Sequence, residues 1–300
     1  MRVLLTGASG FLGRSILEKL SSDNEVVTLG RCSTNDIQVS LTEPLLHMKA
    51  VDKTIDRVIH AAGLAHINPK SRDEEKAFFD VNFLGTKNLC NWIDTWDIKP
   101  KIFVFISSVA VYGASGGLEI DEKHLLNGNT PYALSKIKAE EYVTNWGQKC
   151  GIEILVLRLP LIVGANAPGN LGKMVNGIGK GRYLSIGRGK ARKSMVMADD
   201  VAQLICTEIK SFGIFNLTDG YHPTFSELET IITKQLKTKQ PRSIPLWFAK
   251  IIGFVGNSLT FLPINSEGIN KITSDLTFSD TKARQELGWN PSSVIKNWKI

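Results

Sequence analysis

The chain has 300 residues, of which 43% are hydrophobic, 22% charged and 8% aromatic, enough to bury the core of one large domain or two unequal ones. Its net charge of +7 comes from basic residues spread along the sequence without interleaved aromatics, which argues against nucleic acid as a partner and leaves a small anionic ligand open. Its four cysteines are far apart and outside any Cys/His cluster, so we expect no metal site, no disulfide framework and a reducing cytosol.

The first elements predict a unit that binds a dinucleotide. Residues 3–5 form a short apolar strand and residues 11–20 carry apolar side chains at helical spacing, with Gly7, Gly10 and Gly13 around the junction. Glycine serves this chemistry because a tight turn and close approach of a pyrophosphate both need a backbone without Cβ. The helix N-terminus then supplies free N–H donors and a positive dipole end.

The second predicted strand, 25–31, ends without the acidic residue that commonly holds the ribose 2′-hydroxyl of NAD. Gly30 stands in that place and Arg31 follows it. A guanidinium can pair with the 2′-phosphate of NADP, so this strand end favours NADP over NAD. Two alternatives stay open: Asp36 folds back to replace the missing acid, or Arg31 is a solvated loop residue.

Further alternation of strands and helices predicts a parallel, doubly wound sheet. Residues 56–66 form a third strand that ends in small residues, over which a cofactor can lie. Residues 72–94 have a helical apolar pattern and 101–108 form a fourth buried strand. We interpret His60 as a strand residue and His66 as a loop residue rather than as catalytic groups.

Two later segments carry unusual composition. Residues 173–193 contain seven basic residues, five glycines and no acid, which suits closure of a loop over a diphosphate; the alternative is a solvated surface loop. Residues 244–263 are strongly apolar but interrupted, and no apolar run in the sequence reaches membrane-spanning length. We interpret 244–263 as a helix packed under a lid or at a domain seam rather than a membrane-surface helix.

A set of motifs in order along nearly the whole chain resembles the extended short-chain dehydrogenase/reductases, also called the NAD-dependent epimerase/dehydratase family. The motifs are TGASGFLG (6–13), HAAG (60–63), VNFLGTKNL (81–89), FISSVAVYG (105–113), PYALSK (131–136), RLPLIVG (158–164), RKSMVMADDVAQ (192–203), FNLTDG (215–220) and DTKARQELGW (280–289). The resemblance is greatest to bacterial nucleotide-sugar 4-epimerases and 4-ketoreductases of surface-polysaccharide pathways.

The resemblance implies an α/β fold in two parts. A doubly wound Rossmann sheet is expected over residues 1–165, with 195–220 returning to it. A smaller C-terminal substrate-binding region is expected from residues 166–194 and 221–300. Family members often pair through two long helices, here around 72–94 and 131–149, so a homodimer is expected.

Tyr132 and Lys136 resemble the catalytic pair of the family. Their four-residue spacing places both on one face of a helix, where the lysine charge favours the tyrosine phenolate and the tyrosine can move a proton. Ser108 resembles the hydroxyl that hydrogen-bonds the reacting oxygen, and Ser107 is the neighbouring alternative.

The resemblance also implies the binding residues. Asn82 matches a family position, with a structural cap as its alternative, and Arg192 stands seven residues before Asp199, the spacing of a diphosphate-binding arginine. The implied cofactor contacts are Gly7, Gly10, Phe11, Leu12, Gly13, Arg31, Ala61, Ala62, Asn82, Ser107, Tyr132 and Lys136. The implied substrate contacts are Ser108, Tyr132, Asn170 and Arg192.

These residues predict an NAD(P)-dependent oxidoreductase acting at C4 of a nucleotide-diphosphate sugar. The sugar dehydratases of the family have an acidic pair where this chain has Val109 and Ala110, which cannot move protons, so elimination of water is not expected. A 4-ketoreductase using NADPH and a 4-epimerase retaining NAD stay open. The alternatives are a family carbonyl reductase acting on a non-nucleotide substrate and a non-catalytic dinucleotide-binding protein.

Overall fold

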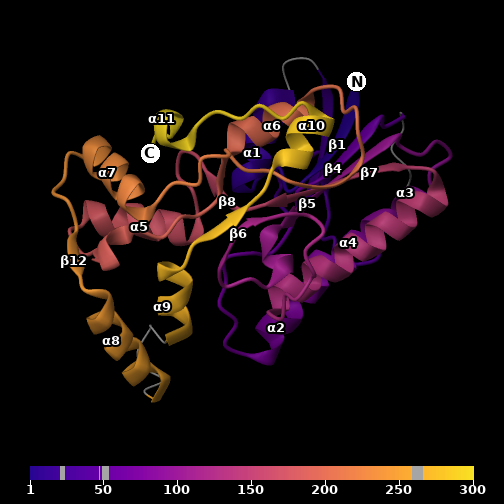
Figure 1. Cartoon of the computed structure of the whole chain (residues 1–300). Coiled ribbons are helices and arrows are strands. Elements are labelled where there is room, and N and C mark those ends of the chain that lie inside the picture. Colours follow the sequence, from indigo (N-terminus) through magenta and orange to yellow (C-terminus); the bar gives the residue numbers. More distant parts are fainter. Residues whose placement is uncertain (21–23, 47, 49–53, 259–265) are drawn as a thin grey trace.

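A parallel sheet of seven strands forms the centre of the larger of two lobes (Figure 1). The computed structural model describes residues 1–20, 24–46, 48, 54–258 and 266–300. Across the sheet the strand order is β3-β2-β1-β4-β5-β7-β11, and the chain changes direction of winding between β1 and β4, as in doubly wound folds. The predicted fold class is therefore confirmed. The strands are β1 (Arg2–Thr6), β2 (Glu25–Gly30), β3 (Ile37–Gln38), β4 (Arg57–His60), β5 (Ile102–Ser108), β7 (Glu153–Leu159) and β11 (Gly213–Asn216).

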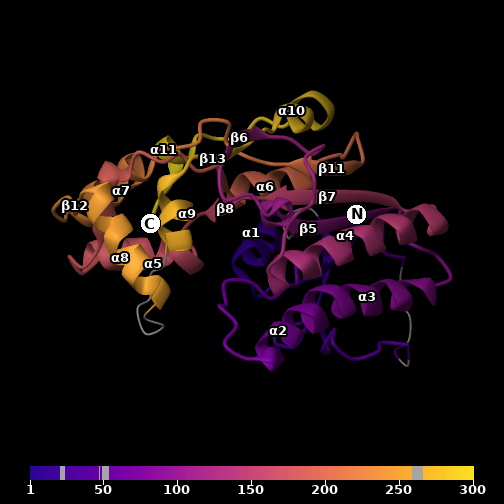
Figure 2. The same ribbon diagram turned by 60° about the horizontal axis from the view of Figure 1, so that its bottom comes forward.

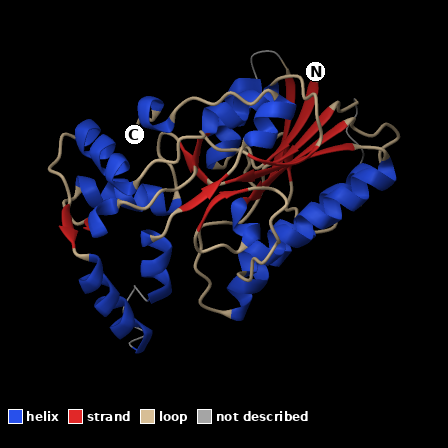
Figure 3. Cartoon of the chain, in the orientation of Figure 1, coloured by secondary structure: helices blue, strands red, loops and turns tan. Residues whose placement is uncertain are grey.

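Helices cover both faces of this sheet, as Figure 3 shows by colour and Figure 2 from a second direction. Strand β5 is apolar along most of its length because both of its faces are covered by helices. Phe103 and Phe105 join the core under one helical layer, whereas Val104 and Ile106 join the core under the other. The first layer contains α3 (Gly85–Asp94) and α4 (Pro131–Cys150), and the second contains α1 (Phe11–Leu20), α6 (Ala198–Cys206) and α10 (Thr281–Leu287).

Helix α4 has well-defined ends that its sequence dictates. The Thr130 side chain accepts a hydrogen bond from the backbone N–H of Ala133, Pro131 occupies the first turn, and Gly151 ends the helix in the left-handed conformation. The N-terminal cap places Tyr132 in the first turn of α4, next to the carboxyl end of β5. Helix α2 (Arg72–Phe78) leads into α3 through a π-helical segment, Phe79–Leu84.

The smaller lobe has its own apolar core, formed mainly by α5, α7 and β10. Its elements and the segments that join it to the large lobe are β6 (Gly117–Ile120), β8 (Leu161–Val163), α5 (Gly169–Gly179), β9 (Leu184–Ile186), β10 (Met195–Met197), α7 (Phe225–Leu236), β12 (Arg242–Ile244), α8 (Leu246–Ser258), α9 (Ser266–Thr273), β13 (Leu276–Phe278) and α11 (Val294–Asn297), with short 3-10 turns at Val109–Tyr112 and Gly187–Gly189. Helices α8 and α9 extend from this lobe away from the central sheet (Figures 1 and 2).

The expectation for residues 244–263 is only partly confirmed. Helix α8 forms, although residues 259–263 of the predicted segment lie outside the described residues. The expected packing is wrong for most of the side chains that are described: Ala249 is buried, whereas Trp247 is 64% exposed and Phe254 is 72% exposed. Among the described residues, no helix is long and apolar enough to cross a membrane.

Candidate active site

The glycine turn after β1 lies against the end of β4. A Cβ on Gly7, whose φ is +77°, would lie 2.6 Å from the backbone nitrogen of Ala62, and one on Gly13 would lie 1.9 Å from the carbonyl oxygen of Gly7. These glycines are therefore required for the turn and for packing α1 against it. Gly10 is exposed, so its side of the turn is open to the phosphates of a ligand.

Four other residues predicted to contact the cofactor lie next to this turn, and not all of them can offer a side chain to it. Leu12 is buried in the core, which leaves its backbone as the only group available to a ligand, whereas Phe11 is half-buried and packs beside Gly164. Ala61 and Ala62 carry small, half-buried side chains at the end of β4, and both backbone nitrogens donate hydrogen bonds to Thr6. The turn thus fits the adenosine and pyrophosphate of a dinucleotide.

At the end of β2, Asp36 and Arg31 are the two residues that could determine the choice between NAD and NADP, and they have different surroundings. Oδ2 of Asp36 accepts hydrogen bonds of 2.8 Å from both the backbone nitrogen and the hydroxyl of Thr28. These bonds, led by the one from the backbone N–H, lower the pKa of Asp36. Asp36 therefore links β2 to β3, whereas Arg31 is exposed beside the strand end.

Tyr132 and Ser108 meet at the carboxyl end of β5. The Ser108 side chain is near enough to Tyr132 to influence its pKa, and the ring of Tyr132 packs edge-on against Phe78 with centroids 6.0 Å apart. Burial raises the pKa of Tyr132, and the Ser108 side chain opposes that rise. Both residues are half-buried, so they can face a ligand.

Lys136 lies one turn further along α4 and is 5% exposed. Its Nζ donates a 2.8 Å hydrogen bond to the carbonyl of Ile106 and lies 4.7 Å from the centre of the Phe105 ring. Burial lowers the pKa of Lys136 to about 8, and the negative charge of Glu140 limits the change. The predicted effect of Lys136 on the Tyr132 pKa stays a prediction.

A buried ionic network lies behind this pair. Nη2 of Arg158 on β7 donates a 2.6 Å hydrogen bond to Oε2 of Glu140 on α4, and the two side chains are 2% and 3% exposed. The Ser107 hydroxyl donates to the other oxygen of Glu140, and Nη1 of Arg158 donates to the Tyr112 hydroxyl. Ser107 is thus turned away from Ser108 and is wrong as the alternative catalytic hydroxyl, because its side chain serves Glu140.

Asn82 has a structural part at the edge of the site. Its side-chain oxygen accepts a 2.7 Å hydrogen bond from the backbone nitrogen of Leu64, and its side-chain nitrogen donates to the Leu64 carbonyl and the Ser135 hydroxyl. It therefore joins the loop after β4 to α4 without capping a helix, and its predicted contact with the cofactor stays a prediction. His60 is also internal: its Nδ1 is hydrogen-bonded to the Thr6 hydroxyl and its Nε2 to the Thr86 hydroxyl, and burial lowers its pKa to about 3.

At the end of the basic segment 173–193, two consecutive residues have opposite surroundings: Arg192 faces solvent and Lys193 is buried. Arg192 is exposed, and its Nε lies 3.9 Å from Oδ2 of Asp275 in an ion pair. Lys193 is buried, and its Nζ donates hydrogen bonds of 2.7 and 2.9 Å to the carbonyls of Lys271 and Ser274 at the end of α9. Asn170 is exposed in the first turn of α5. Arg192 and Asn170 are therefore accessible, although no direct contact joins either to Tyr132.

Comparison with known families agrees with this geometry. Residues 3–217 match the model of the NAD dependent epimerase/dehydratase family, which is more than half of the chain. The chain belongs to this family. The resemblance predicted from the motifs is confirmed, and the matched range includes the glycine turn, Ser108, Tyr132 and Lys136.

Similar proteins extend over nearly the full length of the chain. A protein of Methanocaldococcus jannaschii named putative UDP-glucose 4-epimerase is 28% identical over 98% of this chain and 94% of its own. An Escherichia coli O157:H7 enzyme named N-acetyl-alpha-D-glucosaminyl-diphospho-ditrans,octacis-undecaprenol 4-epimerase is 25% identical over 93% of this chain and 88% of its own. The structure of Thermotoga maritima UDP-glucose 4-epimerase with UDP-glucose has a TM-score of 0.75 at 20% identity, covering 99% of this chain and 96% of that one.

Sequence reasoning missed the Glu140–Arg158 pair. One signal was present: Glu140 follows Lys136 by four residues, so it extends the same helix face as Tyr132. Arg158 gave no such signal, because a charged residue inside an apolar strand has no partner until the strands are aligned. In the sheet Arg158 lies opposite Ser107, which explains how both reach Glu140.

We expect that removing one member of this pair destabilises the protein strongly. Glu140→Ala leaves the Arg158 charge buried without compensation, which costs ~3–5 kcal/mol of unfolding free energy measured in urea. As a control, Asp80→Ala breaks the exposed pair with Lys76, whose atoms lie 2.7 Å apart, and should cost less than ~1 kcal/mol. Equal losses in the two variants would contradict this account of the network.

Proposed function

We propose that the chain is an NAD(P)-dependent oxidoreductase acting at C4 of a nucleotide-diphosphate sugar, as a 4-ketoreductase or a 4-epimerase. The observation that carries the proposal is that half-buried Tyr132 lies near half-buried Ser108, with Lys136 one turn along the same helix. They lie at the carboxyl end of β5, the edge where doubly wound sheets bind ligands. The names of the full-length relatives support the choice of substrate class.

In this proposal the bound nicotinamide cofactor supplies or accepts the hydride. Tyr132 moves the proton at the sugar O4, giving it during reduction and taking it during oxidation, while Ser108 holds that oxygen by a hydrogen bond. Lys136, with a pKa of about 8, is mainly charged at neutral pH and favours the phenolate that proton donation leaves on Tyr132. Burial raises the pKa of Tyr132, so the phenol holds its proton at neutral pH in both versions.

In this proposal, one part of the chain binds the cofactor and another binds the substrate. Residues 1–165 with 195–220 would bind the cofactor, and residues 166–194 with 221–300 would bind the substrate. Two copies would pair through the outer surface of α3 and α4. A hollow of about 650 Å³ on this surface is lined by Tyr142 and neighbouring side chains. A reducing cytosol is the proposed compartment.

Tyr132→Phe should abolish nearly all turnover while dinucleotide binding persists. Phenylalanine keeps the ring packing against Phe78 and removes only the proton carrier, and loss of such a step lowers kcat ~10²–10⁴-fold. Steady-state kinetics with a UDP-4-keto sugar and calorimetric titration of NADPH measure the two quantities. A variant that kept more than ~10% of wild-type kcat would show that Tyr132 is not the proton carrier.

Arg31 should determine cofactor choice. Gly30→Asp with Arg31→Ala replaces a cation with the acid that binds a ribose 2′-hydroxyl, so NADPH should bind more weakly and NADH more tightly. Charge-assisted contacts of this kind contribute ~1.5–3 kcal/mol. An aspartate side chain at position 30 requires Asn35 to move, because a Cβ on Gly30 lies 3.0 Å from the amide nitrogen of Asn35. The Arg31→Ala single variant is the control, and equal affinity of the wild type for both cofactors would disprove the assignment.

Arg192 should bind the substrate diphosphate once its guanidinium turns from Asp275. A lysine cannot reproduce bidentate contact with phosphate oxygens, so Arg192→Lys should raise KM for a nucleotide sugar with little change in cofactor affinity. Lys190→Gln is the matched control because Lys190 is exposed, whereas Lys193 is buried and structural. The inhibition constants of UDP and dTDP give the readout. If neither nucleotide inhibits the wild type, the substrate is not a nucleotide sugar and a carbonyl reductase of another substrate class replaces this proposal.

A further inference from the structure

Helix α8 carries large apolar side chains on its outer side. Trp247, Ile251 and Phe254 follow the i, i+4, i+7 spacing and therefore lie along one stripe of the helix. Their exposed fractions are 64%, 53% and 72%. Phe248, 44% exposed, packs against the Trp247 ring with centroids 5.7 Å apart. We call these four side chains the α8 apolar face.

The α8 apolar face is not used for packing within the described part of the chain. Ala249, 1% exposed, lies on the opposite side of the helix, and α8 contacts α9, where Ile269 is 2% exposed. The helix is thus attached through a small residue, and the four side chains of the α8 apolar face point outward. Single exposed apolar residues are normal on a surface, but four on two neighbouring turns form a patch of the kind that marks an interaction site.

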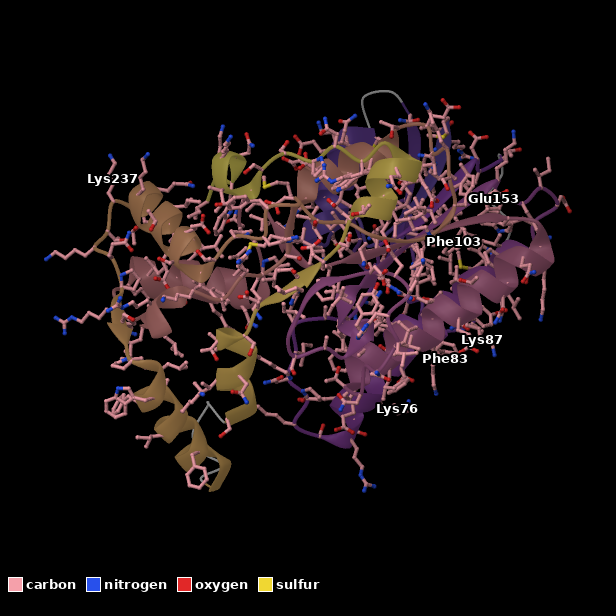
Figure 4. All side chains as sticks on the ribbon, viewed as in Figure 1. Lys76, Phe83, Lys87, Phe103, Glu153 and Lys237 are labelled. Carbon is pink, nitrogen blue, oxygen red and sulfur yellow. The ribbon has the colours of Figure 1, made fainter. Side chains whose placement is uncertain are left out.

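The surroundings of this face are basic. Residues 230–266 contain five lysines and arginines and no aspartate or glutamate. Lys250 is exposed on α8 itself, and Arg188 and Lys190 line a hollow of about 530 Å³ with Leu246 at the start of the helix. Lys237 points outward from the edge of the same lobe in Figure 4. An apolar stripe bordered by cations complements an anionic, partly apolar surface.

We propose that the α8 apolar face inserts into the headgroup and acyl boundary of an anionic phospholipid bilayer, with the adjacent lysines and arginines on lipid phosphates. Helices that lie in this boundary combine tryptophan, phenylalanine and aliphatic residues on one side with lysine or arginine beside them. A second copy of the chain fits less well, because a self-contact through this lobe brings its basic residues against their own copies. Docking of this kind places the small lobe on the membrane surface and leaves the Rossmann sheet outside it.

Vesicle binding tests the proposal without reference to enzyme activity. The purified full chain is mixed with vesicles of phosphatidylcholine and phosphatidylglycerol, or of phosphatidylcholine alone, and sedimented. Of the six tryptophans, Trp247 is 64% exposed and the other five are at most 6% exposed, so acrylamide quenching reports mainly on α8. The test variant is W247S/I251S/F254S, and the control is Ile98→Ser with Leu125→Ser, which removes exposed apolar residues of the large lobe.

We expect the wild type and the control to sediment with the anionic vesicles. The tryptophan emission of the vesicle-bound wild type should shift to the blue and be protected from acrylamide. The triple variant should bind at least ~10-fold more weakly, and Lys250→Gln should weaken binding ~5-fold, an effect that salt diminishes. Circular dichroism establishes that the variants are folded. The proposal is overturned by absent sedimentation, by equal binding of the triple variant, or by a wild-type oligomer that becomes a monomer in the triple variant without any vesicle binding.

Discussion

The ion pair between Glu140 and Arg158 fixes the helix that carries the proposed catalytic side chains. Apolar contacts such as those of Val143 and Trp146 hold α4 on the sheet, but they have little directional preference. The pair adds direction, because three hydrogen bonds join one carboxylate to one guanidinium at a single depth in the core. Since Tyr132, Lys136 and Glu140 follow one another at four-residue intervals, a helix fixed at Glu140 is also fixed at the other two.

The network also determines the charge balance of the site. Lys136 is desolvated, which disfavours its cation, and the Glu140 carboxylate one turn below opposes that loss. Arg158 balances the charge of this carboxylate inside the protein, because a buried charge without a partner is costly. The positive charge next to Tyr132 therefore depends on a residue of β7 that touches neither proposed reactant.

The two lobes contribute different kinds of surface. The large lobe presents a site built from short side chains and backbone groups at the sheet edge, where glycines let the chain approach a ligand closely. The small lobe presents long cationic side chains from segments without acidic residues, together with the α8 apolar face. An enzyme of diphosphate sugars gains from this division, since reaction geometry needs rigid elements whereas anion capture acts over a longer range.

The sequence by itself determined most strands and helices of the first hundred residues, the glycine turn and the Tyr132–Lys136 spacing, because these depend on periodicity and on residues close together in the chain. The family motifs extended this to the fold and the Ser108 hydroxyl. Only the tertiary structure decided that Ser107 serves Glu140, that Asp36 is bound to Thr28, and that the α8 apolar face points outward. Local spacing assigns a side chain to a face of its own strand or helix. What lies opposite that face depends on the register between segments distant in sequence, which no local pattern contains.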